Sequence, residues 1–245
     1  MKVRIFPSPR RAARALAREI ARTVQRHPRL VLGLPTGRTP IPLYRELITL
    51  CRAGQLDLSR ATTFNLDEFL GLPPGDRHSY LAFMRRHLFD HVNLSPQRAH
   101  VLNGAAADPA GECIRYERAI IRAGGIDLMV LGLGRNGHIG FNEPDRSLVL
   151  RTHRTRLRTS TRRANAFLFE HRSSAVPREA LSMGIGTILQ AKKIVLLVTG
   201  ASKARAVARA VNGRVTTRVP ASLLQLHRDV EVWLDEDAAS FISRS

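Results

Sequence analysis

A glycine-rich stretch carries an amide, an imidazole and a carboxylate within eight positions, at Asn136, His138 and Glu143. A histidine gives and takes protons near neutral pH, and a nearby carboxylate can hold its ring and stabilise its cation. A lone histidine bonded to a loop carbonyl would be the structural alternative. Glycines let the backbone approach a ligand closely. This stretch has four of them, at positions 132, 134, 137 and 140.

The same glycines spell G-x-G-x-x-G, the pattern of dinucleotide-binding loops, which requires a following helix and an acidic residue about 20 positions further on. Pro144 interrupts such a helix, and residues 152–163 are almost all Arg and Thr. His138 and Glu143 lack the H-E-x-x-H spacing of a zinc site, and the two cysteines are 62 positions apart. We therefore expect neither an organic cofactor nor a metal.

A second candidate group is the acidic pair Asp67 and Glu68, which follows a predicted strand at 62–66. Ligands of open α/β sheets bind beyond the carboxyl ends of the strands, where this pair would lie. Adjacent side chains on an extended segment point in opposite directions, so only one carboxylate faces the crevice. We assign that position to Asp67; a solvated acidic turn is the alternative.

Two strand-to-helix turns predict anion sites, because free backbone N–H groups and the helix dipole favour a phosphate at a helix N-terminus. The first turn, residues 35–40, lacks the lysine and the spacing of a P-loop, and an ordinary turn is its alternative. Its candidate phosphate-binding residues are Thr36, Gly37, Arg38 and Thr39. The second turn opens a predicted helix at 199–211 and carries Lys203 in its first turn.

Strand and helix patterns alternate along the chain. Apolar runs predict strands at 3–6, 30–34, 62–66, 128–131, 194–198 and 230–234. Helices are predicted between Ser8 and His27 and at 41–51, 77–91, 109–122, 176–189, 199–211 and 221–227, with an irregular antiparallel excursion at 147–158. This alternation predicts one α/β domain over residues 1–245, with a doubly wound, mostly parallel sheet, helices on both faces and a modified Rossmann-like arrangement.

Composition restricts the classes of partner. The formal net charge is +19, yet only four of the 39 basic residues are lysines and aromatic residues make up 5%, which is poor for base stacking. We therefore expect no specific nucleic-acid partner.

No apolar run approaches the length of a membrane span, and the basic N-terminus lacks the apolar core of a secretory signal. For these reasons we expect no membrane binding. Two cysteines imply no disulfide framework, so we also expect a cytoplasmic protein.

Four stretches resemble the glucosamine-6-phosphate deaminases: G-L-P-T-G, F-N-L-D-E-F-L-G, G-R-N-G-H-I-G-F-N-E-P and A-S-K-A, which begin at residues 33, 64, 134 and 201. The likeness runs in register from about residue 30 to residue 235. Sugar-lactonase relatives have a similar G-H motif with a different ending. The resemblance implies conversion of glucosamine 6-phosphate and water to fructose 6-phosphate and ammonia, without a metal or an organic cofactor. A 6-phosphogluconolactonase-like hydrolase and a non-catalytic sugar-phosphate sensor stay as alternatives.

The resemblance also implies a role for each matching residue. Asp67 would take the C2 proton of the open-chain sugar and return a proton to C1. His138 would open the pyranose ring through its ring oxygen, with Glu143 and Asn136 orienting the imidazole. The phosphate would be held by residues 36–39 and Lys203. The chemistry agrees, because a proton shift and a ring opening need separate acid–base groups and an anchored substrate. The expected partner is a small sugar phosphate; a homo-oligomer is left open.

The chain departs from the family pattern in three places. Arg38 replaces a small residue in the phosphate turn, and Phe167 stands where the family usually has a phosphate-binding arginine. We hypothesise that the two changes compensate each other. His153 and Thr155 stand where allosterically regulated members carry Arg and Lys. Hyperbolic kinetics, insensitive to N-acetylglucosamine 6-phosphate, are therefore expected.

Overall fold

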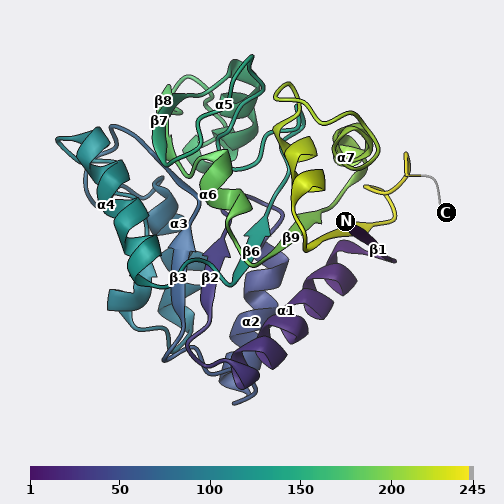
Figure 1. The fold of residues 1–245 in the computed structure, drawn as a ribbon. Helices are drawn as coiled ribbons and strands as arrows, with labels where there is room; N and C mark the ends of the chain where they lie inside the picture. Colours follow the sequence, from purple (N-terminus) through teal and green to yellow (C-terminus); the bar gives the residue numbers. More distant parts are fainter. Residues whose placement is uncertain (243–245) are drawn as a thin grey trace.

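A seven-stranded parallel sheet forms the centre of the protein (Figure 1). The computed structural model describes residues 1–242. The sheet order is β1-β10-β9-β6-β2-β3-β5. The bounds are β1 Lys2–Phe6, β2 Val31–Leu34, β3 Thr62–Asn65, β5 Ala99–His100, β6 Leu128–Leu131, β9 Lys193–Val198 and β10 Val230–Asp235. The six predicted strands and the doubly wound α/β class are confirmed, and β5 is a short addition.

The α-helices are α1 Pro9–Arg26, α2 Ile41–Arg52, α3 Tyr80–His87, α4 Pro109–Arg122, α5 Thr159–Asn165, α6 Ile185–Leu189 and α7 Ala204–Val211. Side-chain caps mark the starts of α1, α3 and α4. At α1, the Ser8 hydroxyl accepts the Arg11 N–H at 3.3 Å. The helix predicted at 77–91 is α-helical only over α3, because Ser79 caps it by accepting the Ala82 N–H at 3.1 Å. Residues 199–211 begin as the 3-10 turn Ala201–Lys203, and residues 220–226 are likewise a 3-10 helix.

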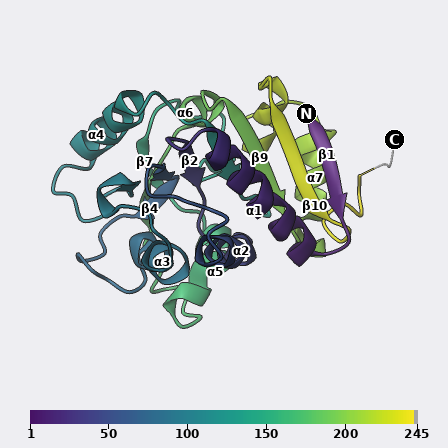
Figure 2. The same cartoon turned by 90° about the horizontal axis from the view of Figure 1, so that it is seen from below.

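Helices cover both faces of the sheet, because its strands are apolar on both sides (Figure 2). Leu128 and Val130 of β6 belong to the core cluster that contains the apolar faces of α1, α2 and α3. Met129 and Leu131 belong to the cluster that contains those of α4, α6 and α7. None of the helices in residues 1–242 has the length and apolarity needed to cross a membrane.

A small antiparallel sheet stands beside the main one, with strands β4 Asp67–Phe69, β8 Glu179–Ser182 and β7 His153–Arg156 in that order. The predicted excursion at 147–158 is confirmed by β7. The predicted helix over 176–189 is correct only for α6. The earlier part of this range is β8, which hydrogen-bonds to β4 on one side and β7 on the other. Because β8 has a partner strand on each of its two edges, these hydrogen bonds outweigh the helical preference of its sequence. Gly184 then lets the chain pass Arg151, whose carbonyl oxygen would be 2.2 Å from an added Cβ.

The order of strands fixes where a ligand can bind. The chain passes from β2 to β3 on one side of β2, and later returns to β6 on the other side. The carboxyl ends of β2 and β6 therefore border the crevice at which doubly wound sheets bind their ligands. The turn at 35–40 follows β2 and the stretch 132–144 follows β6.

Candidate active site

Residues 132–144, here called the β6 loop, fold back on themselves at the carboxyl end of β6. The Gly134 N–H donates to the His138 carbonyl at 2.9 Å, and the Gly137 N–H donates to the Gly134 carbonyl at 3.0 Å. Gly137 has a φ of 93°, which favours glycine. At Gly134 an added Cβ would meet the His138 ring at 2.3 Å, so this glycine makes room for the imidazole.

The three polar side chains of the β6 loop form one cluster. Glu143 Oε2 lies 3.5 Å from His138 Nδ1 and accepts a hydrogen bond from Asn136 Nδ2 at 2.7 Å. Thr161 Oγ1 lies 3.5 Å from the same imidazole nitrogen. The structure therefore brings the predicted amide, imidazole and carboxylate together, and Thr161 joins them from α5.

Glu143 is an anion in this setting. Burial by itself would raise the pKa of Glu143, but hydrogen bonding and charge from His138, with hydrogen bonds from Thr161 and Asn136, lower it to about 2. A carboxylate ionised at neutral pH beside Nδ1 orients the ring and stabilises the imidazolium that forms when His138 takes a proton. The opposite ring nitrogen, Nε2, is then the atom that can exchange a proton with a ligand.

Asp67 lies under the β6 loop, in β4. Burial, with a smaller contribution from the charge of Glu68, raises the pKa of Asp67 to about 8. Its Oδ2 would be 3.7 Å from a Cβ added to Gly140, two residues after His138. The carboxylate and the imidazole thus border the same three-residue stretch of backbone, residues 138–140. A carboxyl group with so high a pKa is a strong base when it is ionised.

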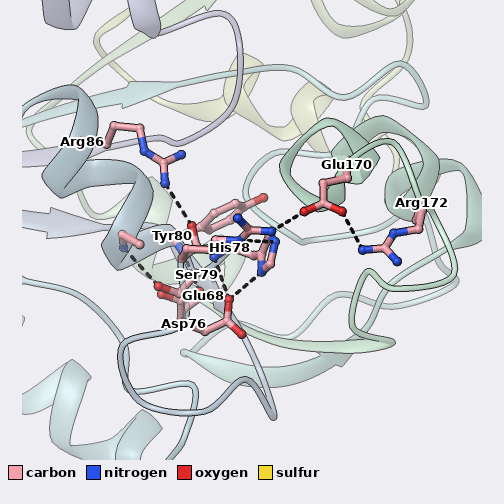
Figure 3. A network of polar contacts seen from close by, with 10 residues as sticks. Glu68, Asp76, His78, Ser79, Tyr80, Arg86, Glu170 and Arg172 are labelled. Carbon is pink, nitrogen blue, oxygen red and sulfur yellow. Dashed lines mark hydrogen bonds and ion pairs between the residues drawn. The ribbon is translucent and has the colours of Figure 1, made fainter.

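Glu68 binds a different element from Asp67, because its carboxylate contacts the start of α3 (Figure 3). Its carboxylate accepts the backbone N–H groups of Phe69 and Tyr80 at 2.8 Å and of Leu81 at 2.9 Å. Burial still raises the pKa of Glu68 to about 7, although these bonds lower it. The prediction that the two carboxylates diverge is confirmed, since Glu68 binds the first turn of α3 and Asp67 faces the β6 loop.

The predicted phosphate residues lie around the carboxyl ends of β2 and β9, which flank β6 on either side. Gly37 has a φ of 98°, as a tight turn requires, and Thr39 directly precedes Pro40, the N-cap of α2. The Lys203 ammonium donates to the Leu133 carbonyl of the β6 loop at 2.5 Å. Burial, and then the charge of Arg135, lower the pKa of Lys203 to about 8.

Residues 159–169, here called the cover segment, comprise α5 and the following 3-10 turn and contact both sides of the site. The Arg38 guanidinium lies over the Phe167 ring, 4.5 Å from its centroid. The Tyr80 hydroxyl donates to Asn165 Oδ1 at 2.9 Å. The cover segment is thus joined to the turn at 35–40 and to α3.

Further contacts hold the end of the cover segment. The His78 ring stacks on Phe169 at 4.8 Å, and Arg77 is ion-paired with Glu170 (Figure 3). The sequence analysis gave no functional role to Tyr80, Thr161 or Asn165. No local pattern could have revealed these roles, because Tyr80 and Asn165 are 85 positions apart.

A cavity of about 640 Å³ lies at the opposite end of the sheet, beside the end of α1 and the starts of β2, β6 and β9. It contains none of the predicted site residues. Of its lining carboxylates, Asp127 is ion-paired with Lys192 at 2.7 Å and Glu19 with Lys193 at 3.9 Å. Its Arg26 lies in the last turn of α1, where a cation offsets the helix dipole. The chemistry is therefore assigned to the crevice at the carboxyl ends.

Known proteins resemble this chain over nearly its whole length. The family model described as glucosamine-6-phosphate isomerases/6-phosphogluconolactonase matches residues 8–233. The glucosamine-6-phosphate deaminase of Halothermothrix orenii is 47% identical over 242 residues, covering 99% of this chain and 100% of that protein. That of Thermoanaerobacter sp. is 45% identical over 242 residues, covering 99% and 95%.

Solved structures of related proteins superpose on this fold. A monomeric glucosamine-6-phosphate deaminase superposes with a TM-score of 0.95 and 44% identity, over 98% of this chain and 100% of that one. The 6-phosphogluconolactonase from Trypanosoma cruzi superposes with a TM-score of 0.77 at 18% identity, over 99% of this chain and 97% of that one, a likeness of fold alone. This chain therefore belongs to the glucosamine-6-phosphate isomerase/6-phosphogluconolactonase family.

Proposed function

We propose that this chain converts glucosamine 6-phosphate and water to fructose 6-phosphate and ammonia. The observation that carries the proposal is the approach of Asp67 to Gly140, two residues after His138 in the β6 loop, in a protein 47% identical to a glucosamine-6-phosphate deaminase over 99% of its length. One group can then act on the C2 proton while the other acts on the ring oxygen of the same sugar.

The reaction begins with ring opening. His138 donates a proton to the ring oxygen as the anomeric hydroxyl loses one, and the bond between C1 and the ring oxygen breaks to give the open-chain aldehyde. Glu143, ionised beside Nδ1, stabilises the imidazolium form that donates. Asn136 holds Glu143 in place by its 2.7 Å hydrogen bond.

The proton shift follows. The Asp67 carboxylate removes the C2 proton, and the aldehyde oxygen takes up a proton released by the substrate ammonium group, which gives an enolamine. The same carboxyl group then returns its proton to C1. The product is a C2 imine, which water hydrolyses to the ketone and ammonia, so no oxidant or reductant is needed. A positively charged substrate amino group next to C2 favours the ionised form of Asp67 once the sugar is bound.

The phosphate is anchored away from the reacting carbons. We assign it to the backbone N–H groups and hydroxyls of residues 36–39, to the Arg38 guanidinium and to the Lys203 ammonium. Lys203 also contacts the β6 loop through Leu133, so phosphate binding and the position of His138 are connected. Anchoring of a non-reacting group supplies binding energy for orientation at the reacting centre.

An ammonia-release assay on glucosamine 6-phosphate tests the proposal. Stoichiometric formation of ammonia and fructose 6-phosphate is expected, with no opening of 6-phosphogluconolactone. Lactone hydrolysis without ammonia release would instead favour a hydrolase, and binding of the sugar phosphate without turnover would favour a sensor.

The pH dependence is expected to be a narrow bell for kcat/KM, centred near pH 8. Asp67 must be ionised, and its pKa of about 8 makes the active fraction rise with pH through that value. Lys203 must be protonated, and its pKa of about 8 makes the active fraction fall through the same value. The bell for kcat is expected to be broader. The amino group of the bound sugar lowers the pKa of Asp67, and its phosphate raises the pKa of Lys203. Steady-state rates from pH 5 to 10 check this; a kcat/KM flat from pH 5 to 7 would contradict it.

Arg38→Ser is expected to raise KM for glucosamine 6-phosphate about tenfold or more, a loss typical of a charge-assisted contact, with kcat changed little. The guanidinium lies over Phe167 at 4.5 Å, so the aromatic ring holds it above the phosphate turn. Arg45→Ser, at an exposed position of α2, serves as the matched control. Initial-rate measurements decide; an unchanged KM in Arg38→Ser would reject the role of this residue.

A further inference from the structure

The strand carrying Asp67 and the loop carrying His138 are both attached to one short piece of chain, Ser182 and Met183 at the end of β8. The Met183 N–H donates to the carbonyl of Leu66, the residue before Asp67, at 2.7 Å. The Met183 carbonyl accepts a hydrogen bond from Asn142 Nδ2 in the β6 loop at 2.8 Å. The end of β8 therefore connects the two halves of the proposed site.

Ser182 occupies the central place in this connection. It is directly opposite Asp67 in the antiparallel pairing of β4 and β8, so both side chains project from the same face of the small sheet. The Ser182 hydroxyl accepts the N–H of Phe141 in the β6 loop at 3.0 Å and donates to the Met183 carbonyl at 3.1 Å. The side chain is fully buried, so water cannot replace it.

The backbone at Gly140 shows how closely the loop approaches this face. Gly140 has a φ of 54°, and an added Cβ would be 3.2 Å from Ser182 Oγ and 3.7 Å from Asp67 Oδ2. The hydroxyl and the carboxylate thus lie under the same glycine, and His138 is two residues away. A hydrogen bond to the next amide, that of Phe141, fixes the height of the loop above Asp67.

We propose that Ser182 is a positioning residue, which sets the separation between the Asp67 carboxylate and the His138 imidazole through its bond to the Phe141 N–H. The inference rests on the proposed function, because the separation matters only if both groups act on one sugar. An ordinary buried serine would affect stability alone. A positioning serine also affects the chemical step, and misplacement by about 1 Å can cost about 100-fold in rate.

The test compares Ser182→Ala and Ser182→Thr with wild type. Ser182→Ala is expected to lower kcat about 10–100-fold with KM within about threefold, because the phosphate anchors do not involve this residue. Ser182→Thr keeps the hydroxyl and is expected to restore kcat to within about threefold of wild type. Thermal denaturation of each variant shows that it is folded at the assay temperature.

Thr187→Val is the matched control, because its hydroxyl is also buried and donates to Glu117 Oε1 at 2.6 Å, outside the β6 loop. It is expected to lose stability while keeping wild-type kcat. A wild-type kcat in Ser182→Ala, or an equal loss of kcat in Thr187→Val, would overturn the inference.

A variant that fails to fold and a wild type that is inactive can each be told apart from a failure of the Ser182 role. Should Ser182→Ala fail to fold, Ser182→Cys keeps the volume with a weaker acceptor and is expected to show an intermediate kcat; wild-type kcat there would also reject the role. Absence of ammonia release in wild type would reject the proposed function itself, whereas normal kcat in the variants of an active enzyme rejects only the role of Ser182.

Discussion

Asp67→Asn is expected to lower kcat about 10²–10⁴-fold, the usual contribution of a positioned acid–base group, and at the same time to stabilise the folded protein at alkaline pH. The first effect follows because an amide cannot take the C2 proton. The second follows because Asp67 is buried, with a pKa raised from 3.8 to about 8 by burial and by Glu68.

The sign of the stability effect comes from the two states of the chain. The folded protein binds a proton at Asp67 up to about pH 8, whereas the unfolded chain releases it near pH 4. Because the unfolded chain can ionise Asp67 and the folded protein cannot, the wild type loses stability increasingly between pH 4 and pH 8. An amide does not ionise, so Asp67→Asn is expected to gain on the order of 5 kcal/mol over wild type at pH 9 and almost nothing at pH 4.

Urea unfolding at pH 4 and pH 9, with ammonia release measured alongside, checks both effects. Asp90→Asn is the matched control, since Asp90 is exposed and pairs with the exposed Arg85 at 3.4 Å. It is expected to change neither kcat nor stability appreciably. An inactive Asp67→Asn with the same stability difference at the two pH values would mean that burial does not perturb this carboxyl group.

His138→Asn is expected to lower kcat about 10²–10³-fold by a different route, because the variant loses ring opening rather than the proton shift. Ring opening and closing interconvert the α and β anomers of glucosamine 6-phosphate. The wild type and Asp67→Asn are therefore expected to accelerate this interconversion, whereas His138→Asn is not. Exchange of the anomeric proton signals, followed by nuclear magnetic resonance at matched enzyme concentration, measures the step directly.

His171→Asn provides the control for this substitution. His171 is exposed and has a φ of 63°, a conformation that asparagine also adopts readily, so neither fold nor activity should change. Anomer interconversion that is fast in His138→Asn and absent in Asp67→Asn would reverse the two assignments. A loss in both variants would point to one shared acid–base group.

Local patterns were enough to predict much of the fold. Ser8 followed by Pro9 predicted the start of α1, and the apolar run at 128–131 predicted β6, because caps and hydrophobic periodicity depend on neighbouring residues. The alternation of side chains on an extended segment also separated Asp67 from Glu68 correctly. The glycine spacing at 132–140 indicated a loop that approaches a ligand closely, although it did not give the positions of the side chains.

The segment at 176–189 shows where local patterns fail. Its composition suits a helix, yet residues 179–182 form β8, because β4 and β7 offer hydrogen-bond partners on both edges. Those partners are more than 100 and about 25 positions away along the chain. The same error concealed Ser182, whose place opposite Asp67 exists only when β8 is a strand.

The sequence alone determined which chemical groups are available: a carboxylate after β3, an imidazole with its carboxylate after β6, and the turns after β2 and β9 to which we assign the phosphate. Tertiary structure decided how those groups behave. Burial raises the pKa of Asp67, contact with His138, Thr161 and Asn136 lowers that of Glu143, and the cover segment brings Phe167 under Arg38. The reason is that residue type and short-range spacing are written along the chain, whereas desolvation, ion pairing and strand partners depend on residues that meet only after folding.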